Sequence, residues 1–189
     1  MTFTFLAALL LVAAPFWESK SPAQWTDIEL RQLLVDSPWA QLVPGPTKTF
    51  APVQVYIATA GPVRQAQMEL ARRANKQGVS EYSLWFEDYS KTQVILAVRV
   101  DKLEPYSEAK EIQQLEKASV MRAGRRKVRM TSYFPPSAAD PYLRIAFPRD
   151  VKLGDKSVGF DIYAPGVPGG FRSAEFKLEA MQIAGKLEL

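Results

Sequence analysis

The chain has 189 residues and a formal net charge of +4, with 47% hydrophobic and 23% charged residues; these values are typical of a folded globular protein. It contains neither cysteine nor histidine, which excludes disulfides, thiolate or imidazole metal sites, cysteine nucleophiles and serine–histidine triads. We therefore expect no metal, no cofactor and no enzymatic activity. Any remaining chemistry would have to come from carboxylates, lysines, tyrosines and hydroxyl groups.

The N-terminal segment is strongly apolar. Residues 2–16 carry no charge, and residues 5–14 are all apolar. This run is shorter than the ~20 residues that a membrane span needs, and it is similar to the apolar part of a secretory signal peptide. We expect residues 1–16 to be a signal peptide or a short N-terminal anchor, and the protein to be exported, periplasmic or extracellular. The alternative is a buried N-terminal helix or strand.

Residues 17–46 are expected to form a helical, tryptophan-rich lead-in. Thr26 and Glu29 have the spacing of a capping box, which predicts a helix that begins after Thr26. Trp25 and Trp39 flank this helix. Two interpretations of these tryptophans remain open, since they could pin the segment onto the protein's own core or dock on a partner.

Residues 47–189 are expected to form a single α+β domain. The predicted fold is a mostly antiparallel β-sheet or sandwich with the helical lead-in and two further helices. Helical spacing and capping signals predict helices over residues 62–74 and after Ser107. Alternating apolar residues predict strands near residues 53–57, 82–86, 93–100, 127–130, 143–147, 158–162, 176–179 and 183–189.

A basic segment lies between residues 122 and 129. Its five cationic residues exceed the net charge of the whole chain, and they are Arg122, Arg125, Arg126, Lys127 and Arg129. One interpretation is a contact with an anionic surface, such as phospholipid headgroups or an anionic glycan. The other is the solvated face of a strand. Nucleic acid is not expected as a partner, because the segment lacks the aromatic residues on which bases stack.

Carboxylates offer the main alternative with a catalytic character. Glu87 with Asp88, Asp150 with Asp155, and Glu104 could contribute a pair for hydrolysis of a glycan-like polymer. Each of these residues is expected at a strand end or in a turn, where carboxylates are common. The spacing does not bring any two of them together.

Residues 25–40 (WTDIELRQLLVDSPWA) and the C-terminal stretches FKLEAM (176–181) and GKLEL (185–189) resemble an uncharacterised family of predicted exported bacterial proteins. The resemblance implies export and a single globular domain, and it implies no catalytic or binding residue. We thus expect a non-enzymatic binding or structural protein of the bacterial cell envelope, whose partner is an envelope protein or an anionic surface. The alternatives are the carboxylate-dependent hydrolase and a peripheral binder of anionic surfaces through residues 122–129.

Overall fold

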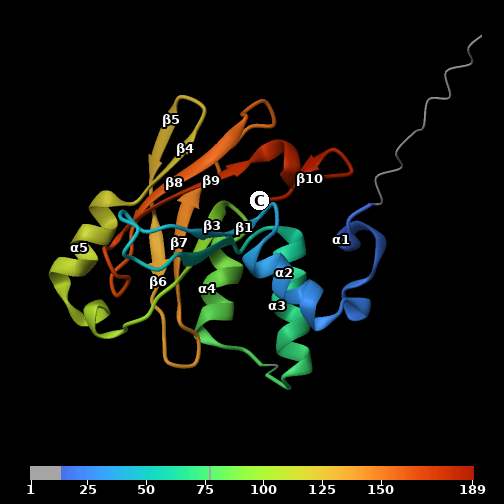
Figure 1. Ribbon diagram of the computed structural model, residues 1–189, viewed down its shortest axis with the longest axis horizontal. Coiled ribbons are helices and arrows are strands. Elements are labelled where there is room, and N and C mark those ends of the chain that lie inside the picture. The colour runs from blue at the N-terminus through green and yellow to red at the C-terminus, as the bar shows by residue number, and fades with distance from the viewer. Residues whose placement is uncertain (1–13, 77) are drawn as a thin grey trace, which may run out of the picture.

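Two antiparallel sheets form the body of the protein in the computed structural model, which describes residues 14–76 and 78–189 (Figure 1). The five-stranded sheet has the order β1 (Ala40–Val43), β2 (Val53–Ile57), β3 (Gln93–Arg99), β7 (Tyr142–Pro148), β6 (Ser132–Phe134). The four-stranded sheet has the order β5 (Arg126–Arg129), β4 (Val120–Ala123), β8 (Ser157–Tyr163), β9 (Phe171–Lys177). The predicted α+β fold with antiparallel sheets is confirmed.

The two sheets pack face to face. Phe147 of β7 and Phe160 of β8 meet between them with ring centroids 5.4 Å apart, and within the four-stranded sheet Phe160 also contacts Phe176 of β9 at 6.0 Å. The central strand β3 is buried on both faces, as its uninterrupted apolar run predicts. One of its faces meets the four-stranded sheet, so the other needs a different cover.

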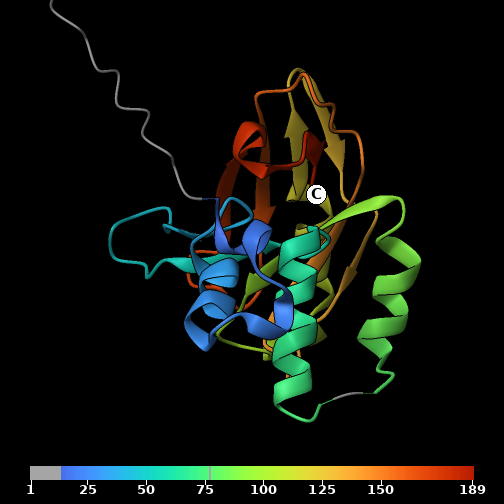
Figure 2. The same cartoon turned by 90° about the vertical axis from the view of Figure 1, so that its right-hand side faces the viewer.

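Helices provide that cover. The helices α2 (Asp27–Val35), α3 (Gly61–Arg73) and α4 (Glu81–Tyr89) lie on the same side of the five-stranded sheet (Figure 2). Thr26 caps α2 through the predicted capping box with Glu29. The helix α5 (Ala109–Ala118) packs at one end, against β8. The described part of the chain also contains four short helical segments: the α-helix α1 (Phe16–Ser19) and the 3-10 helices η1 (Pro22–Gln24), η2 (Glu104–Ser107) and η3 (Leu178–Met181).

The strand predicted near residues 82–86 is wrong, because this segment is the helix α4. The alternation of Tyr82 and Phe86 belongs to a longer helical stripe that also includes Trp85 and Tyr89, at spacings of three and four residues. Ser80 caps the helix by accepting the backbone N–H of Ser83. The capping serine therefore distinguishes the helical repeat from the strand repeat in this segment. With α4, three α-helices follow the lead-in among the described residues, whereas two were predicted.

Smaller differences occur elsewhere. The helical lead-in also contributes a strand, since Ala40–Val43 pairs with β2. Ser107 does not cap α5; it ends η2, and its hydroxyl donates to the Glu104 carbonyl. The expected final strand is instead a small hairpin of β10 (Gln182–Ile183) and β11 (Lys186–Leu187).

Candidate functional site

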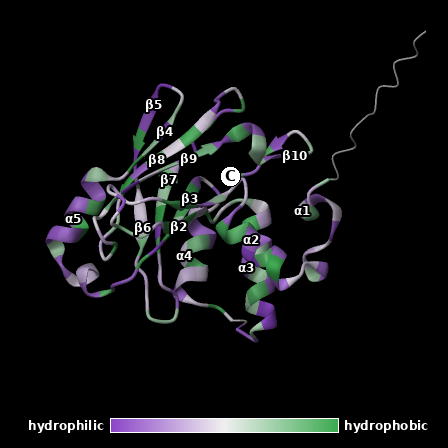
Figure 3. Cartoon of the chain, viewed as in Figure 1, coloured by the Kyte–Doolittle hydropathy of each residue, from purple (hydrophilic) through white to green (hydrophobic). Residues whose placement is uncertain are grey.

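The basic segment forms the β4–β5 hairpin at one edge of the four-stranded sheet. Residues Arg125, Lys127 and Arg129 are exposed, and the start of β5 has a hydrophilic colour in Figure 3. No ion pair involves these three side chains among residues 14–76 and 78–189. The edge position leaves them open to solvent, and their charges are uncompensated by near neighbours.

The other two basic residues are paired. Arg122 lies across β8 and contacts both carboxylate oxygens of Asp161, with Nε–Oδ2 at 2.8 Å and Nη2–Oδ1 at 3.0 Å. Gly159 makes room for this guanidinium, since a Cβ there would lie 3.1 Å from Arg122 Nη2. The predicted five-residue cluster is therefore divided into three free cations and two whose charge is offset.

Arg126 joins the hairpin to the loop between β7 and β8. Its guanidinium contacts Asp150 at 3.0 Å and Asp155 at 2.5 Å. The Lys152 backbone N–H, which donates to Asp155 at 2.8 Å, and the Arg126 guanidinium both hold the pKa of the Asp155 carboxyl below its ordinary value. Asp155 stays ionised near neutral pH, so it keeps the two loops together.

We call the two joined loops, residues 123–126 and 150–156, the basic tip. Beside it lies a shallow hollow of about 350 Å³ between the hairpin, the loop and β9. The two acidic residues at this hollow are already engaged, because Asp155 binds Arg126 and Glu175 accepts a hydrogen bond from Ser157 at 2.5 Å. Lys156 also lines the hollow, but a hydrogen bond from a neutral serine leaves the negative charge of Glu175 in place. The cations that can face a partner are therefore those of the hairpin rather than those of the hollow.

The two tryptophans considered for partner docking lie inside the protein. The exposed fractions of Trp25 and Trp39 are 1% and 0%, respectively. Trp39 packs edge to face on Trp17 and donates its indole N–H to the carbonyl of Glu188 at 2.8 Å. Of the two interpretations, the structure supports the one in which both residues pin the lead-in onto the protein's own core, and neither side chain is exposed for contact with a partner.

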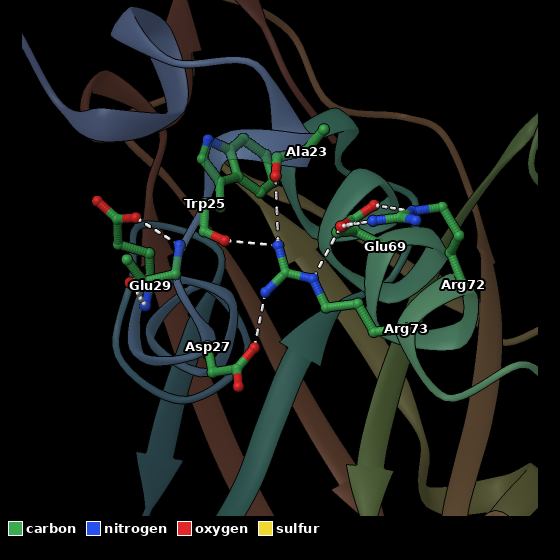
Figure 4. Close-up of polar contacts among 8 residues, drawn as sticks. Ala23, Trp25, Asp27, Glu29, Glu69, Arg72 and Arg73 are labelled. Carbon is green, nitrogen blue, oxygen red and sulfur yellow. Dashed lines mark hydrogen bonds and ion pairs between the residues drawn. The ribbon is translucent and has the colours of Figure 1, made fainter.

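An ion-pair network holds the lead-in in place from outside (Figure 4). Arg73 of α3 donates to Asp27 at 2.7 Å and to the Trp25 carbonyl at 2.6 Å, while its Nε donates to Glu69 at 2.8 Å. Hydrogen bonds from Arg72 and Arg73 lower the pKa of Glu69 to about 2. This cluster is an internal clamp between α3 and the segment before α2, and all its charges are satisfied.

Three of the five carboxylates considered for hydrolysis have other contacts. Asp150 and Asp155 share the cation Arg126, and Glu87 pairs with Arg64 at 2.7 Å. Arginine side chains already engage the carboxylate oxygens of these three residues, so they are not free to serve as a catalytic pair. Among the described residues, no group of three or more acidic side chains is arranged to hold a metal ion. No helix of the described chain is both long and apolar enough to cross a membrane.

A second hollow lies between α3 and α4 and is more apolar. Met68, Ala71 and Phe86 line it, and its volume is about 500 Å³. The Arg64–Glu87 ion pair joins the two helices at this groove. The charges of this pair compensate each other, and Lys76 adds one further cation to the lining. With one such cation, against three on the hairpin, the groove is less suited to an anionic surface.

Sequence reasoning did not include the β7–β8 loop in the site. In this loop it considered only the carboxylates Asp150 and Asp155, although Lys152, Leu153 and Lys156 are all exposed beside the hairpin. Two lysines around a leucine are too common in turns to predict a binding site on their own.

Comparison with known proteins adds no assignment, because no family model, no curated protein and no solved structure matches the chain.

Proposed function

We propose that this protein is an exported, non-enzymatic protein of the cell envelope that binds an anionic surface through the β4–β5 hairpin. The observation that carries the proposal is a set of three exposed, unpaired cations on one hairpin: Arg125 lies in its turn, and Lys127 and Arg129 lie on the edge strand β5. Each such cation near an anionic surface contributes about 1 kcal/mol. Three together would therefore supply about 3 kcal/mol, a factor of roughly 150 in affinity at low salt.

Paired arginines support this use of the hairpin. Arg122 and Arg126 are held by acidic residues of β8 and of the β7–β8 loop, so they stiffen the hairpin and leave the outer cations to face a partner. A basic edge strand also prevents pairing with other sheets. Preventing strand pairing needs charge only on the edge strand. It does not require the β7–β8 loop with its lysines, which Arg126 holds beside the hairpin.

A charge-matched comparison tests the proposal. Arg125, Lys127 and Arg129 are replaced together by glutamine, and a control variant replaces the exposed Lys48, Lys110 and Lys117, so both lose three charges. Binding of the full chain is measured to phosphatidylglycerol vesicles by flotation and to immobilised heparin, at 50 and 500 mM NaCl. We expect the hairpin variant to lose about 100-fold in affinity at low salt, the control variant to change little, and high salt to abolish the difference. Equal loss in both variants would show that net charge alone matters and would refute the proposal.

A further inference from the structure

The basic tip brings two loops from distant parts of the chain to one end of the molecule. In both views the β4–β5 turn and the β7–β8 loop lie together at the same end of the sandwich (Figures 1 and 2). A Cβ on Gly124, which has φ +57°, would lie 2.9 Å from Asp155 Oδ1. The turn therefore approaches the loop closely, and Arg126 bridges the two through Asp150 and Asp155.

Hydrogen bonds hold the β7–β8 loop in one shape. Asp155 accepts the Lys152 N–H on its carboxylate at 2.8 Å and donates its own N–H to the Lys152 carbonyl at 3.0 Å. Lys156 is held at the end of the loop, where its carbonyl accepts the N–H of Leu178 at 3.1 Å. The intervening residue Leu153 is consequently presented outward, with 59% of its surface exposed.

The surroundings of Leu153 distinguish it from an ordinary surface leucine. Single exposed leucines are common and need no explanation. Leu153, however, lies at the end of the molecule between Lys152 and Lys156, and the exposed Arg125 is on the adjoining turn. An apolar side chain with cations on the same loop and the adjoining turn suits the boundary between headgroups and acyl chains, where lysine ammonium groups stay at the headgroups and the leucine enters the apolar layer.

We infer that the anionic surface is a phospholipid bilayer and that the β7–β8 loop takes part in binding by inserting Leu153. The inference rests on the proposed function and adds to it a partner and a residue. Charge complementarity selects anionic headgroups, and the leucine separates a bilayer from a soluble anionic polymer, since a heparin chain has no apolar layer for it to enter. Asp155 acts as a positioning residue, because it holds the loop against the hairpin.

The test compares two leucine variants of equal exposure. Leu153→Ser removes the apolar group at the tip, and Leu84→Ser removes one on α4 that is also 59% exposed. Both full-length variants are measured on vesicles of phosphatidylglycerol with phosphatidylcholine and on immobilised heparin, after thermal unfolding has confirmed that they fold. We expect Leu153→Ser to bind vesicles at least about 10-fold more weakly, with unchanged heparin binding, and Leu84→Ser to behave as the unmodified protein.

Other outcomes separate the two proposals. If Leu153→Ser binds vesicles as well as the unmodified protein does, while the hairpin glutamine variant binds poorly, insertion is refuted and the proposed function stands. Binding of the unmodified protein to heparin but not to vesicles also overturns the bilayer as partner. Absence of binding to either probe overturns the proposed function itself.

Discussion

The two buried tryptophans allow a direct measurement of what one hydrogen bond contributes to this fold. Trp25 and Trp39 have exposed fractions of 1% and 0%, so replacing either by phenylalanine removes a similar volume from the core. Their indole N–H groups differ. That of Trp39 donates to the Glu188 carbonyl at 2.8 Å, and that of Trp25 is buried without an acceptor among residues 14–76 and 78–189.

The structure sets the size of the expected difference. Both substitutions lose apolar contacts and leave a small cavity, at a cost of about 1–3 kcal/mol each. Trp39→Phe also loses a hydrogen bond that contributes about 1 kcal/mol, whereas Trp25→Phe removes an unpaired buried donor whose burial costs about 1–3 kcal/mol. Trp39→Phe should therefore be more destabilising than Trp25→Phe by about 2–4 kcal/mol, or roughly 5–15 °C in Tm.

Urea unfolding followed by far-ultraviolet circular dichroism provides the assay, because this signal does not depend on the number of tryptophans. Equal m-values in the two variants would show that the change lies in native-state stability. If the two variants were equally destabilised, or if Trp25→Phe were the worse of the two, the hydrogen-bond argument would be refuted. The contribution of the two tryptophans would then come from their packing and not from the indole hydrogen bond.

The remaining predictions concern backbone geometry and pH. Gly166 has φ +76°, and a Cβ there would lie 2.0 Å from the Lys102 carbonyl oxygen, so Gly166→Ala should greatly lower the Tm. Gly185 has the same φ but open space around it, so Gly185→Ala should cost only about 1 kcal/mol of stability. Gly154→Ala should be neutral, and thermal melts of the three variants check this order. Glu69 has a folded-state pKa of about 2, below the ordinary 4.5, so its contribution to stability is present above pH 4.5 and is lost as the pH falls toward 2. Glu69→Gln should therefore be less stable than the unmodified protein at pH 7 in urea unfolding, and the gap should close at pH 2; a gap that persists there would contradict the assigned cause.

Local signals in the sequence account for most of the fold. The capping box of Thr26 and Glu29 and the apolar alternation of β7 and β8 each specify structure within a few residues, and the structure has these elements where they were predicted. The error at α4 has the same local origin. A short alternating run fits both periods, and only the capping serine and the longer aromatic stripe distinguish a helix from a strand.

The candidate site, like the fold, could be predicted only in part from the sequence. Charge counting along the chain located the basic segment, but it could not separate Arg126, which is paired, from Lys127, which is free. Pairing depends on Asp150 and Asp155, which reach the hairpin only when β4 lies beside β8. Leu153 joins the same end of the molecule for the same reason, and nothing in its immediate neighbours in sequence indicates this.

The sequence by itself determined most of the secondary-structure pattern, the absence of imidazole and thiol chemistry, and the position of the charge, because each depends on residue type and short-range spacing. Only the tertiary structure decided that Trp25 and Trp39 face inward, that two of the five cations are offset, and that a second loop adjoins the hairpin. These outcomes depend on contacts between residues far apart in the chain, which form when the two sheets and the helical layer bury their apolar faces together.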